Sequence, residues 1–237
     1  MKKLLLLCLG LCALCAEPKV LIFGDSNTFG TTDNQGGAHD ENKLYWAIAS
    51  KTLNKKADIR VNALPGRTIG LDFPSEHFNG FKALKETLKA ERADILVVML
   101  GTNDLLIGAK PDMAAEAFSN FITYAKKQGI KGLLIIAPPL LDFGDEKGAE
   151  VLKSYSLAFN DELRKIANEN NAFFIDAIKI IGKAKEKDGV HLSQEDHAKL
   201  APAVANWLNE ILKNTRFYCL LSAFNLEFLQ NIIKGQK

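Results

Sequence analysis

Five short apolar runs, separated by longer stretches with helical periodicity, most constrain what this chain can fold into. The runs are residues 19–23, 57–63, 93–100, 131–139 and 171–177. The third run, ADILVVML, is continuous and rich in branched side chains, which is typical of a strand buried on both faces of a parallel sheet. The fourth run ends at two prolines, which cannot donate to a strand ladder.

The intervening stretches predict helices over residues 42–53, 76–92, 112–128, 147–170 and 193–213. Asp112 is expected to cap its helix and Gly129 to end it. Ser193 is expected to open the last helix, with Asp196 as an acidic partner three residues on. Alternating strands and helices predict one three-layer α/β/α domain over residues 17–213, built on a five-stranded parallel sheet.

Residues 1–16 have the features of a secretory signal peptide: a basic start, an apolar run too short to span a bilayer, and small residues at its end. Cleavage near Ala16 or Cys15 would give a periplasmic or secreted protein. The alternatives are a retained membrane anchor, or a lipoprotein acylated on Cys15 or Cys12.

The charge and cysteine content exclude several classes of protein. Thirty basic and 28 acidic residues give a formal charge of +2, which offers no basic stripe for nucleic acid. Cys219 is the one cysteine beyond residue 16, so no internal disulfide is expected, and its apolar neighbours indicate a buried, inert thiol. Beyond residue 16 no CxxC pair occurs, and HExxH is absent from the sequence, so no metal is predicted.

The last segment, residues 214–237, carries apolar residues at helical spacing and extends beyond the predicted domain. It is expected to pack on the domain or on a second copy of the chain, which would make a homo-oligomer. A helix that lies on a membrane surface is the alternative, although its polar face has little basic charge.

Polar motifs follow the predicted strands, where parallel α/β sheets bind their ligands. Residues 24–30 read GDSNTFG, 64–68 read LPGRT, 101–104 read GTND and 188–193 read DGVHLS. Together they supply a hydroxyl, an imidazole, a carboxylate and hydrogen-bond donors. This set predicts nucleophilic catalysis by a serine.

Ser26 is a weak nucleophile that needs a base to accept its proton. Histidine suits that task near neutral pH. Of the four histidines, His39 and His77 lie in stretches predicted to be polar and flexible, and His197 lies inside the last helix. His191 precedes that helix at the functional edge of the sheet, so we expect it to be the base.

Asp188 stands three residues before His191, close enough to hold its second ring nitrogen and stabilise the imidazolium. A developing oxyanion needs preorganised donors, and the candidates are the backbone N–H groups of Ser26 and Gly66 and the side-chain amide of Asn103. Glycine at position 66 allows the backbone to approach substrate closely.

The motifs GDSN, PGR, GTND and DGVH resemble the four blocks of the SGNH hydrolases, also called the GDSL esterase/lipase family. The resemblance covers residues 20–213 and is closest to the bacterial arylesterase/acyltransferase branch. It implies a flavodoxin-like α/β/α fold and a triad of Ser26, His191 and Asp188. It also implies an oxyanion hole of Ser26, Gly66 and Asn103. Asn27 departs from the family pattern, in which many members have leucine.

Further residues are assigned around this site. We expect Thr102 and Val190 to line the substrate pocket and Asn27 to lie on its acyl side. Arg67 is expected either to meet an anionic substrate or to project into solvent. Asp25 and Asp104 are expected to be structural, and residues 31–43 to form a mobile rim.

The expected reaction is hydrolysis of carboxylic esters, with small acyl groups favoured and no cofactor. A lysophospholipase, an acyl thioesterase and an O-acetyl-glycan deacetylase are the alternative activities, so the substrate is a small ester, a lipid or an O-acetylated glycan. From other classes, a flavodoxin-like module that binds phosphate or nucleotide on residues 24–30 is an alternative, as is a carbohydrate-binding module without activity.

Overall fold

The computed structural model describes residues 17–33, 36–54 and 57–213. The predicted signal peptide at 1–16 and the predicted extension at 214–237, with Cys219, lie outside these described residues.

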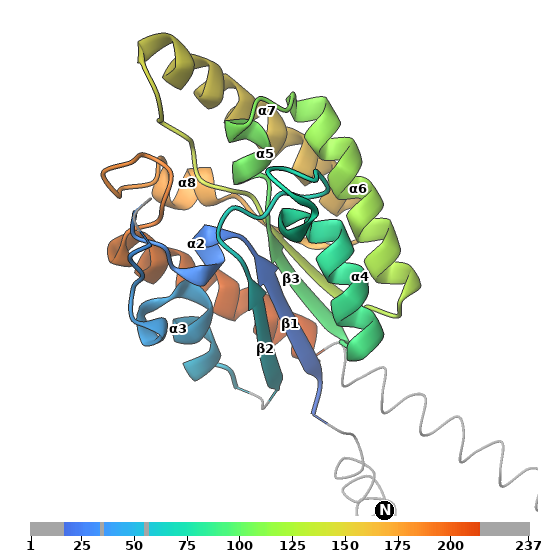
Figure 1. Cartoon of the computed structure of the whole chain (residues 1–237). Coiled ribbons are helices and arrows are strands. Elements are labelled where there is room, and N and C mark those ends of the chain that lie inside the picture. Colours follow the sequence, from blue (N-terminus) through green and yellow to red (C-terminus); the bar gives the residue numbers. More distant parts are fainter. Residues whose placement is uncertain (1–16, 34–35, 55–56, 214–237) are drawn as a thin grey trace, which may run out of the picture.

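A sheet of five parallel strands forms the middle layer, as predicted (Figure 1). Its strands lie in the order β2-β1-β3-β4-β5, which is the flavodoxin order. Their bounds are β1 (Lys19–Gly24), β2 (Asp58–Ala63), β3 (Ile95–Met99), β4 (Gly132–Ile136) and β5 (Phe173–Ile175). From β1 the chain adds β2 on one side and then β3, β4 and β5 on the other. The carboxyl ends of β1 and β3 therefore lie side by side where the strand order changes direction. Open α/β sheets bind ligands at this point.

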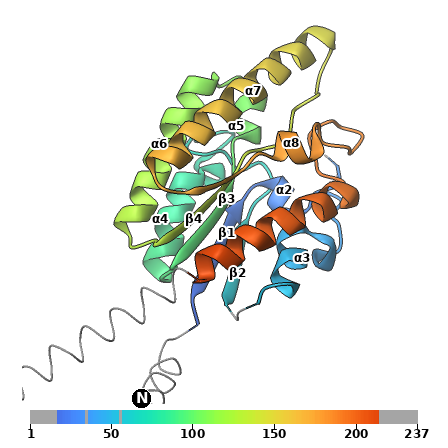
Figure 2. The ribbon, with the colours of Figure 1, turned by 180° about the vertical axis from the view of Figure 1, so that it is seen from behind.

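Helices cover both faces of the sheet (Figures 1 and 2). One face packs against α4 (Gly80–Ala90), α6 (Pro111–Lys127) and α7 (Glu146–Glu169). The other packs against α3 (Tyr45–Lys51), α8 (Ala177–Ile181) and a helix over residues 194–213. Short helical segments complete the fold: α2 (Ser26–Phe29), α5 (Thr102–Leu106), η1 (Glu41–Lys43) and η2 (Glu76–Phe78).

The central strands are buried because successive side chains enter two different cores. On β3, Leu96 and Val98 pack toward α6 and α7, whereas Ile95 and Val97 pack toward the helix over 194–213. Every residue of β3 is buried, as its continuous apolar run predicted. By contrast, β2 is an edge strand and its residues are half-buried or exposed.

Two predicted helix boundaries have different outcomes. Ser193 and Asp196 form a reciprocal capping box: Ser193 N–H donates to Asp196 Oδ2 at 3.1 Å, and Asp196 N–H donates to Ser193 Oγ at 3.2 Å. The expected cap at Asp112 is wrong. Pro111 already occupies the first turn of α6, so Asp112 lies inside the helix.

The short helices α2, α5 and α8 were not predicted. Each has only four or five residues, too few to show a helical period in sequence. Among the residues that the structure describes, no helix is both long and apolar enough to cross a membrane.

Candidate active site

A pocket of about 410 Å³ opens at the carboxyl ends of the strands, between segments that are far apart in the sequence. It gathers five of the residues predicted to lie at the site, namely Ser26, Gly66, Asn103, Val190 and His191. The rest of the lining comes from Phe29, Thr31, Asp33, Gly36, Pro65, Leu106 and Phe143. Thr31, Asp33 and Gly36 belong to the segment that was predicted to form a rim.

Ser26 begins a tight turn directly after β1. Asp25 caps the four-residue helix α2, and its Oδ1 accepts the Asn27 N–H at 3.0 Å. Gly24 leaves no space for a side chain, because a Cβ there would lie 2.0 Å from Thr28 Oγ1. The turn thus fixes the Ser26 backbone at the end of the strand.

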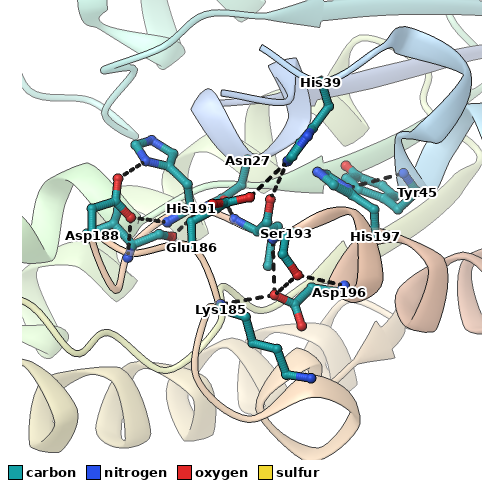
Figure 3. Close-up of polar contacts among 12 residues, drawn as sticks. Asn27, His39, Tyr45, Lys185, Glu186, Asp188, His191, Ser193, Asp196 and His197 are labelled. Atoms are coloured by element: carbon teal, nitrogen blue, oxygen red, sulfur yellow. Dashed lines mark hydrogen bonds and ion pairs between the residues drawn. The ribbon is translucent and has the colours of Figure 1, made fainter. Parts of the chain in front are cut away.

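His191 and Asp188 form a short polar pair, visible in Figure 3. His191 Nδ1 lies 2.5 Å from Asp188 Oδ2, and both side chains are largely buried. Burial alone would raise the pKa of Asp188, but hydrogen bonds from the His191 ring and from the backbone of His191 and Val190 outweigh it and lower that pKa. Asp188 is therefore charged at neutral pH, which orients the ring and favours the N–H at Nδ1.

The Asn103 side chain is oriented by the backbone beside Gly66. Its Nδ2 donates one hydrogen bond to Arg67 O at 2.9 Å, and the same nitrogen carries a second hydrogen. Gly66 has φ +82°, in the left-handed region that favours glycine. Within the described part of the chain, neither the Ser26 N–H nor the Gly66 N–H donates to another protein group. Both therefore remain available to a ligand.

Two buried carboxyl groups support these turns. Asp25 caps α2, as described above, and Asp104 accepts the Ile69 N–H with both oxygens, at 2.9 and 3.1 Å. Burial raises the pKa of Asp25 to about 6 and that of Asp104 to about 7. Asp104 thereby links α5, which carries Asn103, to the segment that carries Gly66. These contacts match the structural roles expected for both residues.

The raised pKa of Asp104 predicts a specific pH dependence of stability. Because its folded pKa is about 7 and its ordinary value is 3.8, folding takes up a proton between these values. The stabilisation is complete below about pH 4 and is lost as the pH rises through about 7.

The Asp104→Asn variant lacks this titration and serves as the reference. We expect the wild type to lose up to about 4 kcal/mol of unfolding free energy relative to this variant between pH 4 and pH 7. Urea unfolding of both proteins at several pH values measures this difference. A difference that stays constant with pH would contradict the assignment.

Three side chains expected at the substrate lie elsewhere. The Arg67 guanidinium is buried between Gly24 O, at 3.0 Å, and Asn62 O, at 2.7 Å, and it stacks over the Phe23 ring. It therefore neither faces solvent nor lines the pocket. Its hydrogen bonds hold the end of β1 to the end of β2, which is a structural role and not the predicted contact with substrate or solvent.

Thr102 and Asn27 are also completely buried, and neither lines the pocket. Thr102 lies in the first turn of α5. The Asn27 side chain contacts the backbone of Val190 and Leu192. Of the four side chains expected to bind substrate, Val190 is the one that lines the pocket.

The sequence predicts a flexible polar stretch around His39, but the side chain of this residue is only 7% exposed. Its Nε2 lies 3.0 Å from Leu192 O and 3.4 Å from Glu186 Oε1 (Figure 3). His39 is about 150 positions from Leu192 and Glu186 in the sequence, so no local sequence pattern could have predicted these contacts. Among the residues with described positions, no three His, Cys, Asp or Glu side chains gather so that they could hold a metal ion.

Comparison with known proteins agrees with this architecture. A model of the GDSL-like lipase/acylhydrolase family matches residues 22–199, well over half of the chain. The fold and this match define a carboxylic ester hydrolase of the α/β/α class. The chain belongs to the GDSL-like lipase/acylhydrolase family. No protein with a curated description is detectably similar to it in sequence.

Several solved structures share the fold. A carbohydrate acetylesterase family member from Sinorhizobium meliloti has a TM-score of 0.72 at 23% identity, covering 83% of this chain and 99% of that one. An arylesterase candidate from Agrobacterium tumefaciens str. C58 has a TM-score of 0.70 at 28% identity, covering 82% and 99%. The aryl esterase of M. smegmatis has a TM-score of 0.68 at 21% identity, also covering 82% and 99%.

Proposed function

We propose that the protein hydrolyses carboxylic esters of short acyl groups through an acyl-enzyme on Ser26, with His191 as base and Asp188 as its partner. The observation that carries the proposal is the 2.5 Å contact between His191 and Asp188, with His191 lining the same pocket as Ser26. In this pairing the carboxylate keeps the proton on Nδ1, so that Nε2 can accept one.

In the proposed first step, His191 Nε2 takes the Ser26 hydroxyl proton while Oγ bonds to the ester carbonyl carbon. The electron pair of the carbonyl moves to its oxygen, which the N–H groups of Ser26, Gly66 and Asn103 would bind. The intermediate collapses, the bond to the leaving alcohol breaks, and His191 protonates that alcohol. Asp188 stabilises the imidazolium while it carries the proton.

In the second step, water repeats the sequence on the acyl-enzyme. His191 takes a proton from water as the water oxygen bonds to the acyl carbon, and the bond to Ser26 Oγ then breaks. The returning proton restores the serine hydroxyl, and the carboxylic acid leaves. The mechanism uses no metal and no organic cofactor.

A module that binds nucleotide without catalysis explains the arrangement less well. Such a module would use the backbone of the turn after β1, but it gives no role to the buried His191 and Asp188 pair. It also gives no role to the oriented amide of Asn103. Ester hydrolysis uses all of these groups.

The short acyl preference is supported by the shape and lining of the site. The pocket has a volume of about 410 Å³, and its lining mixes polar groups with Phe29, Leu106, Phe143 and Val190. Phe29 and Phe143 are 47% and 43% exposed, so apolar surface is available near the mouth for the alcohol part of an ester. An acetylated glycan is a second candidate substrate, because structural neighbours include a carbohydrate acetylesterase family member and an acetylxylan esterase.

A series of p-nitrophenyl esters tests the acyl preference. We expect kcat/KM to be highest for acetate to butyrate and to fall at least about tenfold by octanoate, because the methylenes of a longer acyl chain would lie against the polar groups of the lining and displace their water. A matched assay of acetate release from O-acetylated xylan tests the glycan candidate. A rise of kcat/KM toward long chains would instead favour a lysophospholipase or a thioesterase.

A further inference from the structure

Hydrogen bonds hold every backbone polar group of the His191 loop, defined as residues 190–192. The three residues 190–192 have six backbone polar groups, and each has a partner in the structure. Among the N–H groups, those of Val190 and His191 donate to Asp188 Oδ1, and that of Leu192 donates to Asn27 Oδ1. Among the carbonyl oxygens, Val190 O accepts from Asn27 Nδ2 and His191 O accepts from the Glu186 N–H. The third carbonyl oxygen, Leu192 O, contacts His39 Nε2.

Asn27 supplies two of these bonds, one on each side of His191. Its Oδ1 lies 2.9 Å from Leu192 N and its Nδ2 lies 3.3 Å from Val190 O. The side chain reaches across 163 to 165 positions of sequence, and the residue is completely buried. Figure 3 shows it directed at the His191 loop.

Asn27 links the turn that carries Ser26 to the loop that carries His191. Asn27 directly follows Ser26 on α2, and its own N–H is fixed by Asp25 Oδ1 at 3.0 Å. One primary amide therefore connects the turn that carries the serine to both neighbours of the histidine. Only a side chain with a donor and an acceptor on the same planar group can make both contacts.

We propose that Asn27 is a positioning residue, which sets the placement of the His191 ring relative to Ser26 by bridging Val190 O and Leu192 N. The inference rests on the proposed function, in which His191 must reach the Ser26 hydroxyl. Asn27 touches neither substrate nor the reacting atoms. Its effect is on the geometry of proton transfer, where a displacement of about 1 Å can cost about 100-fold in rate.

The first test is Asn27→Leu, which keeps a similar volume and removes both polar atoms. We expect kcat for p-nitrophenyl acetate to fall about 100-fold while KM changes less than about threefold, because the pocket lining is unchanged. The matched control is Thr28→Val on the same helix, which removes the buried contact between Thr28 Oγ1 and Tyr45 Oη at 3.0 Å. Its kcat should stay within about threefold of the wild type, since the hydrogen bonds of Thr28 go to Asp25, Tyr45 and Trp46 and not to residues 190–192.

The second test is Asn27→Asp, which separates positioning from general damage to the fold. A protonated carboxyl can donate to Val190 O and accept from Leu192 N, whereas a carboxylate would face the Val190 oxygen with no hydrogen to share. We therefore expect the ratio of the N27D kcat to the wild-type kcat to rise at least about fivefold from pH 8 to pH 5.5. The ratio for N27L should stay flat.

The titratable groups that face Asn27 and the His191 loop are Asp25, Asp188, His191, His39 and Glu186. These groups are present in the wild type, N27D and N27L alike, so the N27L ratio serves as the control for any pH dependence that they contribute. All assays are run below the unfolding temperature of each variant, as measured by circular dichroism.

The inference is overturned if N27L keeps kcat within threefold of the wild type, or if the N27D ratio does not change with pH. His191→Ala, assayed in parallel, keeps the two proposals distinguishable. If H191A is inactive while N27L is fully active, only the positioning role of Asn27 fails. If H191A is itself active, the proposed function fails, and this inference fails with it.

Discussion

Ser26→Ala is expected to lower kcat for p-nitrophenyl acetate by about 10⁵-fold, because the substitution removes the hydroxyl that lines the pocket beside His191 and that attacks the ester in the proposed mechanism. The residual rate should come from the oxyanion donors and from substrate binding alone. Steady-state hydrolysis at neutral pH, with enzyme purified from a host that lacks other esterases, measures the loss.

The same variant should keep its fold. The substitution removes one oxygen atom and retains the turn geometry set by Gly24 and Asp25, so the unfolding free energy should change by less than about 1 kcal/mol. Thermal unfolding followed by circular dichroism provides this control. A variant that folds normally and retains more than a tenth of wild-type turnover would remove Ser26 from the mechanism.

His191→Ala is expected to cause a loss of about 10⁴- to 10⁶-fold, similar to that of Ser26→Ala, because the serine without its base is a poor nucleophile. The double variant S26A/H191A should be no slower than the slower single variant. This plateau is expected when two groups act as one unit, since the second substitution removes an effect that is already lost.

Single and double variants should be compared by kcat under saturating substrate. Losses that multiply in the double variant would mean that Ser26 and His191 act independently, in contradiction to the proton transfer between them. Imidazole added to H191A offers a further check, and partial recovery of the rate would support the role of a base at this position.

The middle layer of the fold was predictable because its signals are local. The run 93–100 is uninterrupted, and β3 is buried at every residue. The run 171–177 was predicted as one strand, but β5 ends at Ile175, where Asp176 caps the short helix α8. Here a capping aspartate, with its side chain accepting the Lys179 N–H, shortens the strand.

Much of the candidate site was predictable for a related reason: the ends of parallel strands meet at one edge of a sheet. That rule placed Ser26, Gly66, Asn103 and His191 together, and the structure brings them to one pocket. The contact between Asp188 and His191 followed from a spacing of three residues within one turn.

The side chains that were not placed correctly from the sequence make contacts between distant segments. Composition and periodicity carry no information about such contacts. Arg67 carries a charge and follows a strand, which suggested solvent or substrate, yet its guanidinium binds backbone oxygens inside the domain. Asn27 and His39 are polar residues in short local segments, and only the folded chain shows that Asn27 bonds to the backbone of Val190 and Leu192 and that His39 contacts Leu192 O.

Reaction with a fluorophosphonate tests the central claim most directly, because the reagent bonds to a serine only when a base and oxyanion donors activate it. Intact-mass and peptide mass spectrometry should show one adduct per chain, on Ser26, together with complete loss of esterase activity. The S26A and H191A variants should remain unlabelled under the same conditions. An adduct on another residue, or a fully active protein after treatment with excess reagent, would contradict the account.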